Sequence, residues 1–316
     1  MTKFKTGLFA LGISLFCLSA VQCTHRAGCN ASAPDTQALT DTLSKITSDY
    51  PGEIGVAVII DNADTVAVNN KSIYAMMSVF KVHQALALCN DFDRKGLFLD
   101  SLIAMQRDKL DPDTWSPMLK DHREAEFALP VKELLRYTLI QSDNNASNLM
   151  FNRLADVART DSFIATLIPR QSFKIAYTEE EMSADHAKAY SNRTSPLGAA
   201  TLMNRLFTDS LISKGKQSFI METLEQCSTG KDRIVAPLLD KEGVVVAHKT
   251  GSGYTNEAGI LAAHNDVAFI RLPNGKHYAL AVFVKDFKGS EEEAAKAIAR
   301  ISAAVYSFIS VRQRRQ

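Results

Sequence analysis

The chain has 316 residues, of which 36 are basic, 35 are acidic and 46% are hydrophobic. This is the composition of an ordinary globular protein that is large enough for one domain or two. The near-neutral charge balance argues against a nucleic-acid partner, and the seven histidines are scattered without the Cys/His spacing of a metal site. We therefore expect no nucleic-acid partner, no metal and no cofactor.

The N-terminus is typical of an exported protein. Two lysines precede an apolar run over residues 7–21, which is short for a transmembrane helix and typical of a secretory signal peptide. We expect a signal peptide over residues 1–23, with cleavage between residues 22 and 30, and a periplasmic monomer without a transmembrane segment. Cys23 and Cys29 follow the apolar run and leave a lipid anchor as an alternative.

Secondary structure alternates in type along the rest of the chain. Apolar spacing predicts a first helix near the mature N-terminus, then a hairpin of two strands, and helices from residue 78 to about residue 225. Strands resume after residue 243, with a turn at residues 273–275, and an amphipathic helix ends the chain. The expected helices cover residues 35–50, 131–140, 196–207, 218–227 and 291–311, and the expected strands cover residues 55–60, 65–68, 244–248, 267–272 and 278–284.

These elements indicate an α/β (α+β) fold. Strands are expected only at the two ends of the chain, where they can form one five-stranded antiparallel sheet covered by the N- and C-terminal helices. Residues 30–76 and 226–316 then form a sheet domain, and residues 77–225 form an inserted all-helical domain. Because ligand sites favour domain junctions, we expect the active site in the cleft between the two.

A Ser-x-x-Lys motif begins the helical segment at Ser78 and Lys81. A spacing of three residues places both side chains on one helix face, where a lysine amine of lowered pKa can take the serine proton. The backbone N–H of a serine at a helix N-terminus can also stabilise an oxyanion. The motif also occurs at Ser213 and Ser228, so only its context separates a nucleophile from a helix cap with a solvated lysine.

The string Ser142-Asp143-Asn144 follows a leucine-rich helix. Such a polar cluster can be a simple turn or a helix cap. In the functional interpretation, Ser142 relays a proton to a leaving nitrogen, Asn144 donates to a substrate amide carbonyl, and Asp143 braces the turn.

A third motif, Lys249-Thr250-Gly251, ends an apolar strand. A strand edge can pair with an extended acyl group, and a lysine with a neighbouring hydroxyl suits a carboxylate. Gly251 lets a ligand approach the backbone closely, and the N–H of Ser252 can be a second oxyanion donor. A plain hairpin turn is the alternative interpretation of this string.

With these three motifs in this order, the chain resembles class A serine β-lactamases from about residue 36 to its C-terminus. The resemblance is closest to the CfxA-like branch of extended-spectrum cephalosporinases. It implies that Ser78 is the nucleophile and Lys81 its base or proton relay, and that the reaction is hydrolysis of the β-lactam amide of cephalosporins and also of penicillins, which gives antibiotic resistance.

The resemblance also implies a glutamate that activates the water for deacylation. The acidic run Glu179-Glu180-Glu181 offers three candidates; counting back from residues 194–196 selects Glu179, with Glu181 as second choice. Relatives usually carry an arginine and an asparagine where this chain has Tyr177 and Ser183. Ser183 can still support the water, and Asn148 is expected to brace the loop.

Other positions leave alternatives open. Trp115 matches a wall that packs against substrate, but the only tryptophan of the chain could equally belong to the core. Many relatives carry an arginine for the substrate carboxylate near Ala258, a role for which Arg233 or Arg271 can substitute. Export permits disulfides, so a bridge between Cys89 and Cys227 is one alternative, although Cys89 fits a buried free thiol better. Many relatives have a pair of bridged cysteines at two other positions, where this chain has Ala85 and Leu135.

Two further functions share the three motifs. A penicillin-binding carboxypeptidase would be acylated at Ser78 but would stay trapped, because it lacks the deacylating glutamate. A β-lactam sensor would signal after acylation through a transmembrane partner segment, which is not visible after the leader. The candidate Glu179 favours the hydrolase.

Overall fold

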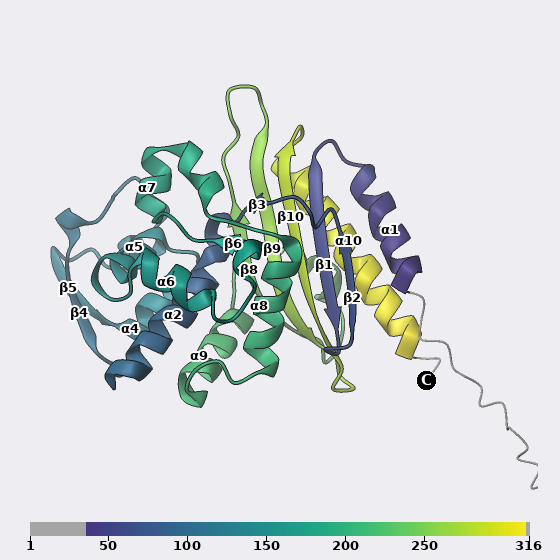
Figure 1. Ribbon diagram of the computed structural model, residues 1–316. Helices are drawn as coiled ribbons and strands as arrows, with labels where there is room; N and C mark the ends of the chain where they lie inside the picture. Colours follow the sequence, from purple (N-terminus) through teal and green to yellow (C-terminus); the bar gives the residue numbers. More distant parts are fainter. Residues whose placement is uncertain (1–35, 314–316) are drawn as a thin grey trace, which may run out of the picture. The chain divides into compact units, whose positions relative to one another are not determined.

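The computed structural model describes residues 36–313, and the predicted signal peptide and candidate lipid-attachment cysteines lie outside this range. The described residues form one compact unit, in which helices lie on both sides of a central sheet (Figure 1). The expected division of this unit at residues 77 and 225 into two domains stays a prediction.

The central sheet has five strands in the order β2-β1-β10-β9-β8, and all neighbours are antiparallel, which confirms the expected sheet. The two C-terminal strands are longer than the sequence pattern predicted, and the turn between them contains Gly275 at a φ of +82°. The strands are β1 (Glu53–Ile60), β2 (Asp64–Val68), β8 (Val245–Ser252), β9 (Leu261–Arg271) and β10 (His277–Phe287).

Both faces of the sheet are covered, which explains why its central strands are nearly continuous apolar runs. Side chains of β1 and β10 alternate between the faces. Val56, Val58 and Leu280 pack in a core with the terminal helices α1 (Thr36–Ser48) and α10 (Glu291–Gln313). The other face carries smaller residues such as Ala57 and Ala281, which belong to the core shared with the remaining helices. Helix α8 (Pro196–Thr208) packs directly against β1, β9 and β10 on that side.

The segment between the two parts of the sheet is mainly helical. Its helices are α2 (Phe80–Lys95), α3 (Pro117–Asp121), α4 (Val131–Ile140), α5 (Asn144–Arg153), α6 (Val157–Ile164), α7 (Glu179–Ala184), α8 and α9 (Lys214–Glu225). Helix α4 has its predicted bounds, whereas α9 begins four residues earlier than expected and ends two residues earlier.

The expectation that strands occur only at the two ends of the chain needs correction. A two-stranded sheet pairs β4 (Leu102–Gln106) with β5 (Glu126–Pro130), and a three-stranded sheet joins β3 (Tyr74–Ala75), β7 (Arg193–Thr194) and β6 (Phe173–Lys174). Strand β4 is mostly exposed, β5 is exposed or half-buried throughout, and the other three strands have two residues each. Neither kind of strand produces the apolar alternation from which strands are recognised in a sequence.

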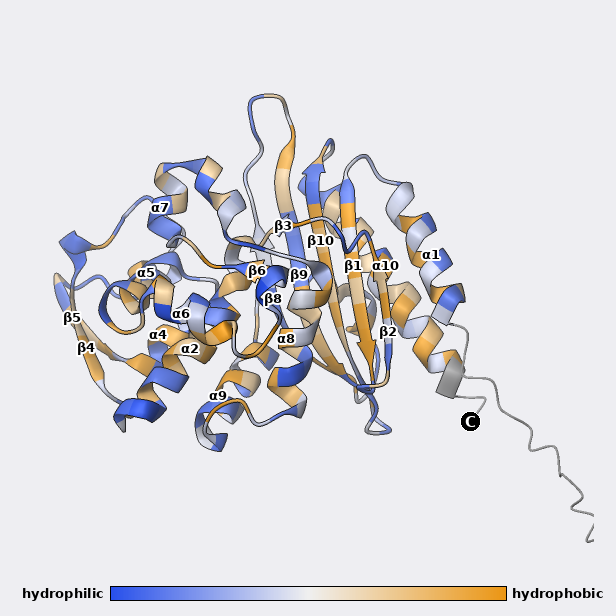
Figure 2. Ribbon diagram, viewed as in Figure 1, coloured by the Kyte–Doolittle hydropathy of each residue, from blue (hydrophilic) through white to orange (hydrophobic). Residues whose placement is uncertain are grey.

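Helix α10 is long and apolar enough, over Glu291–Val311, to pass a length-and-composition test for a membrane span, and no other helix within residues 36–313 passes it. Its orange stripe in Figure 2 corresponds to side chains that are buried against the sheet, among them Ile298, Ile301 and Val305. This burial is what a core helix shows.

The described cysteines are free thiols. Cys89 is fully buried in α2, and Cys227 is half-buried after the end of α9. The alternative of a bridge between them is therefore wrong for this structure.

Helix α2 also buries a histidine, His83, which is 1% exposed. Burial lowers the pKa of His83 to about 4, against an ordinary value of 6.5. Below pH 6.5 the unfolded chain therefore binds a proton that the folded protein excludes, and folding stability falls as the pH drops from 6.5 towards 4.

We expect His83 to cost the protein about 2 to 3 kcal/mol of unfolding free energy between pH 7 and pH 4. The variant His83→Leu should lose this part of the pH dependence, and its unfolding midpoint in urea should fall less steeply with acid than that of the wild type. Circular dichroism at pH 7 checks that the variant is folded. Equal acid sensitivity of the two proteins would contradict the prediction.

Candidate active site

Ser78 lies in a short 3₁₀ turn, η1 (Met77–Val79), that leads directly into α2. The residue before it, Met77, has a φ of +46°, in the left-handed region that side chains with a Cβ disfavour. The turn is attached to the sheet by Asn265 of β9, whose side-chain nitrogen donates to the carbonyl oxygens of Ala75 and Met76 at 2.9 and 3.2 Å. These two hydrogen bonds fix the Ser78 turn to strand β9 of the central sheet.

Lys81 lies one turn further along α2 and its side chain is fully buried. Its ammonium nitrogen is 3.0 Å from Ser78 Oγ, 2.6 Å from Asn144 Oδ1 and 2.8 Å from the carbonyl oxygen of Ser142. A carboxylate oxygen of Glu179 lies 2.9 Å away. A buried charge is tolerated only when such partners replace its water, so this ammonium holds three separate segments together.

Glu179 is the first residue of α7, and the hydroxyl of Ser78 donates to its Oε1 at 2.9 Å. Glu181, the second candidate, is engaged elsewhere: it forms a capping box with Thr178, with distances of 2.9 and 3.2 Å for the two hydrogen bonds. The structure therefore brings Glu179, and not Glu181, to the serine. Asn148 of α5 accepts from the backbone N–H of Glu180 at 3.2 Å, so it contacts α7 within the segment where the braced loop is predicted.

The loop before α7 is held by Asn192, a residue that sequence reasoning missed. Its side chain accepts from the backbone N–H groups of Ala176 and Tyr177 at 2.7 and 3.0 Å and donates to the carbonyl of Tyr177 at 2.8 Å. Its own carbonyl accepts from Met76 N at 2.8 Å. This asparagine therefore gives the loop fixed contacts at Ala176 and Tyr177.

The Ser142-Asp143-Asn144 turn lies between α4 and α5 and faces Lys81. Ser142 has a φ of +62°, and its hydroxyl accepts from the ammonium groups of Lys249 at 2.9 Å and Lys81 at 3.4 Å. Asp143 caps α5 through Ala146 N, as the bracing role requires, and burial raises its pKa.

The Lys249-Thr250-Gly251 motif lies on β8, the edge strand next to the turn. Lys249 is fully buried, and burial lowers its pKa to about 7. A Cβ on Gly251 would come 2.3 Å from the carbonyl oxygen of Met76, so only glycine lets β8 lie this close to the Ser78 turn. The three motifs therefore meet at one place.

The two arginine candidates separate clearly. Arg233 is buried, and its guanidinium donates to Ser252 Oγ at 2.6 Å and to the carbonyls of Gly251 and Asn265 at 3.3 and 2.7 Å. Arg271 instead pairs with Glu225 on the surface, 2.5 Å apart. Only Arg233 contacts the Gly251–Ser252 end of β8, whereas Arg271 lies opposite Val245 at the other end of that strand.

Trp115 is 54% exposed, so the alternative that it belongs to the core is wrong. Its indole nitrogen donates to the carbonyl of Gln141 at 2.8 Å, and its own carbonyl accepts from Asn144 N at 3.0 Å. It therefore lies at the surface beside the Ser142–Asn144 turn.

Five of the predicted residues line one pocket of about 210 Å³: Ser78, Asn144, Glu179, Ser183 and Ser252. The same pocket is lined by residues that the sequence did not single out, among them His186 and Tyr254. Their rings stack directly on each other, with centroids 4.0 Å apart.

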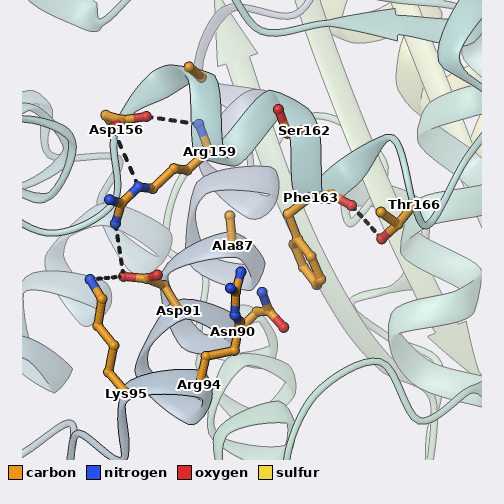
Figure 3. Close-up of a pocket in the computed structure, with 11 residues that line it drawn as sticks. Ala87, Asn90, Asp91, Arg94, Lys95, Asp156, Arg159, Ser162, Phe163 and Thr166 are labelled. Carbon is orange, nitrogen blue, oxygen red and sulfur yellow. Dashed lines mark hydrogen bonds and ion pairs between the residues drawn. The ribbon is translucent and has the colours of Figure 1, made fainter.

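Another hollow, of about 680 Å³, lies between α2 and α6 (Figure 3). Its rim carries a network in which Asp91 pairs with Lys95 and Arg159, and Arg159 also contacts Asp156. None of the predicted site residues lines it, so the candidate active site is the smaller pocket.

Comparison with known proteins agrees with this site. Residues 38–309 match the family model described as "Beta-lactamase enzyme family". A β-lactamase of Phocaeicola vulgatus is 66% identical over 309 residues, which cover 96% of each chain. The crystal structure of the TLA-3 extended-spectrum β-lactamase superposes with a TM-score of 0.83 at 33% identity, over 87% of this chain and 99% of that one. A class A β-lactamase from Bacteroides cellulosilyticus gives 0.81 at 30% identity, over 86% and 97%.

The fold and the site define a serine hydrolase of the penicillin-binding-protein-like fold. The chain belongs to the β-lactamase enzyme family, and within it to class A.

The attachment of the Ser78 turn to Asn265 gives a test of how the site is held. Asn265→Asp would place a buried oxygen against two carbonyl oxygens, which should cost about 3 kcal/mol of unfolding free energy and most of the β-lactamase activity. Asn256→Asp is the matched control, because Asn256 only accepts there, from Ala258 N and Ile260 N at 3.0 Å each. Urea unfolding and steady-state hydrolysis measure both variants; equal effects would contradict the prediction.

Proposed function

We propose that this enzyme hydrolyses the β-lactam amide of cephalosporins, and also of penicillins, through an acyl-enzyme on Ser78. The observation that carries the proposal is that Ser78 Oγ lies 3.0 Å from the ammonium of Lys81 and 2.9 Å from the carboxylate of Glu179. A serine hydroxyl is a weak nucleophile unless a neighbouring group takes its proton. The carboxylate of Glu179 is in reach to take this proton directly, and Lys81 can take it once it has lost its own proton and is a neutral amine.

In acylation, Lys81 acts as base or relay for the proton of Ser78. The backbone N–H groups of Ser78 and Ser252 stabilise the oxyanion. The proton then reaches the leaving nitrogen through Ser142, whose hydroxyl lies between the ammonium groups of Lys81 and Lys249. Asn144, bound to Lys81 at 2.6 Å, holds the substrate amide carbonyl through its own amide nitrogen.

Substrate binding uses the cationic end of the site. Lys249 and Thr250 bind the substrate carboxylate. Arg233 adds a positive charge next to them and positions Ser252 by donating a hydrogen bond to its hydroxyl. Gly251 leaves room at the strand edge, and Trp115 provides a wall at the rim of the Asn144 turn. No cofactor is needed for these steps.

Deacylation separates this function from a trapped penicillin-binding protein or a sensor. Glu179 activates the hydrolytic water, and Ser183, which lines the same pocket, supports it. A carboxylate that accepts from the nucleophile itself favours a hydrolase over a trapped acceptor. The similarity to TLA-3, an extended-spectrum β-lactamase that this chain covers almost completely, supports cephalosporins as substrates.

We also propose that the mature protein is an exported periplasmic monomer that confers antibiotic resistance, with a lipid anchor at Cys23 or Cys29 as the alternative. The proposal rests on the basic and apolar N-terminal pattern of the sequence.

We expect Glu179→Gln to be acylated by a cephalosporin but to release product about 100- to 10,000-fold more slowly, because the general base is lost. Intact mass followed over time should show a persistent adduct. Glu181→Gln is the matched control: it weakens the cap of α7 but should deacylate normally. Ser78→Ala should form no adduct. A persistent adduct in Glu181→Gln together with turnover in Glu179→Gln would reverse the assignment.

The two arginines give a second test. Arg233→Gln should raise KM for a cephalosporin about tenfold with a smaller effect on kcat, because the carboxylate loses support in both ground and transition states. Arg271→Gln removes a surface ion pair and should leave KM within about twofold. Near-ultraviolet circular dichroism checks that both variants are folded, and a larger effect of Arg271→Gln would contradict the assignment.

A further inference from the structure

A cysteine, a histidine and an aspartate form a cluster beside the active site and have no part in the proposed reaction. Cys227 follows α9, His248 directly precedes Lys249 on β8, and Asp266 lies opposite on β9. His248 and Asp266 are 2% and 0% exposed, and Nδ1 of the imidazole lies 3.0 Å from Oδ1 of the carboxylate. This is the arrangement in which an aspartate orients a histidine towards a thiol.

The charges around the cluster favour a thiolate. Burial opposes the charged form of His248, but the adjacent carboxylate of Asp266 outweighs it and raises the pKa of His248 to about 10. Burial likewise opposes a thiolate at Cys227, yet the hydrogen bond and charge of His248 lower the pKa of Cys227 to about 7, and Lys249 acts in the same direction. Arg233 is the other cation whose charge reaches Cys227. Such neighbours favour the thiolate, which is the nucleophilic form of a cysteine.

The sulfur of Cys227 is also connected to the substrate site. It lies 3.4 Å from the hydroxyl of Thr229, which lies 2.6 Å from the hydroxyl of Thr250. Thr250 is a proposed carboxylate-binding residue. A group attached to the sulfur would therefore displace the hydroxyl of Thr229 and, through it, the hydroxyl of Thr250 in the substrate site.

The other described cysteine has the opposite environment. Cys89 is fully buried in α2, and burial raises its pKa to about 12. Cys227 lies outside the helix core and is only half-buried as a residue, and its neighbours lower the pKa of its thiol instead of raising it. The contrast predicts selective chemistry at one of the two thiols.

We propose that Cys227 is a thiol-modification site at which a small disulfide forms a mixed disulfide that slows β-lactam hydrolysis. The thiolate sulfur of Cys227 bonds to one sulfur of the reagent, the reagent's S–S bond breaks, and the second sulfur leaves as a thiolate. Cys227 is oxidised and the leaving sulfur is reduced, so no other reactant is required. The effect on hydrolysis rests on the function proposed above.

The test uses the full-length protein and bis(2-hydroxyethyl) disulfide, a small neutral reagent. Peptide mass spectrometry locates each adduct, so cysteines in residues 1–35 are counted separately. We expect labelling of Cys227 but not of Cys89, a fall in kcat/KM of about tenfold, and recovery after dithiothreitol. The variant Cys227→Ser should hydrolyse at the wild-type rate and should not respond to the reagent.

The pH dependence tests the cluster itself. Labelling of Cys227 should rise with a midpoint near pH 7, and the ultraviolet absorbance difference between wild type and Cys227→Ser should titrate with it. His248→Gln should move the midpoint upward. An unlabelled Cys227, labelling without loss of activity, or a midpoint at the ordinary thiol value of about 8.5 would overturn the proposal. Failure of the untreated enzyme to hydrolyse any cephalosporin would instead overturn the proposed function, because labelling is read by mass alone.

Discussion

The buried ammonium of Lys81 is the interaction on which the geometry of the site depends. It has no exposed surface, so its charge must be balanced by protein oxygens, and it finds them on Ser78, Ser142, Asn144 and Glu179. Because an unbalanced buried charge costs several kcal/mol, a shift of any one of these segments would be resisted by the others. One side chain thus fixes the start of α2, the turn before α5 and the start of α7 relative to one another.

A second buried cation, Lys249, contacts the same serine hydroxyl as Lys81. Lys249 approaches the hydroxyl of Ser142 at 2.9 Å, while Lys81 lies on the other side of it at 3.4 Å. Burial lowers the pKa of Lys249 to about 7, and the nearby charge of Lys81 adds to this effect. A hydroxyl that accepts from two lysines, one of which has a lowered pKa, is placed to pass on a proton, as the proposed transfer to the leaving nitrogen requires.

Some of this architecture could be predicted because its signals are local. The sheet follows from apolar runs, and the three motifs follow from their order. The choice between Glu179 and Glu181 was harder because both belong to one acidic run, although Thr178 three residues before Glu181 is a capping-box signal that could have decided it. Asn192 and Asn265 had no such signal. Their importance comes from backbone groups far away in the sequence, which only the folded chain brings to them.

Two residues of the site, Met77 and Ser142, have unfavourable backbone conformations that the surrounding structure must hold in place. Met77 and Ser142 both have positive φ angles, a conformation that costs about 1–3 kcal/mol at each residue that is not glycine. Such strain persists only where the surroundings leave the chain no alternative. Asn265 on one side and the Lys81 contacts on the other provide that constraint, and both are anchored to elements whose apolar faces are fully buried. The sheet core therefore affects the chemistry indirectly, because it keeps the turns at Met77 and Ser142 at a fixed distance from each other.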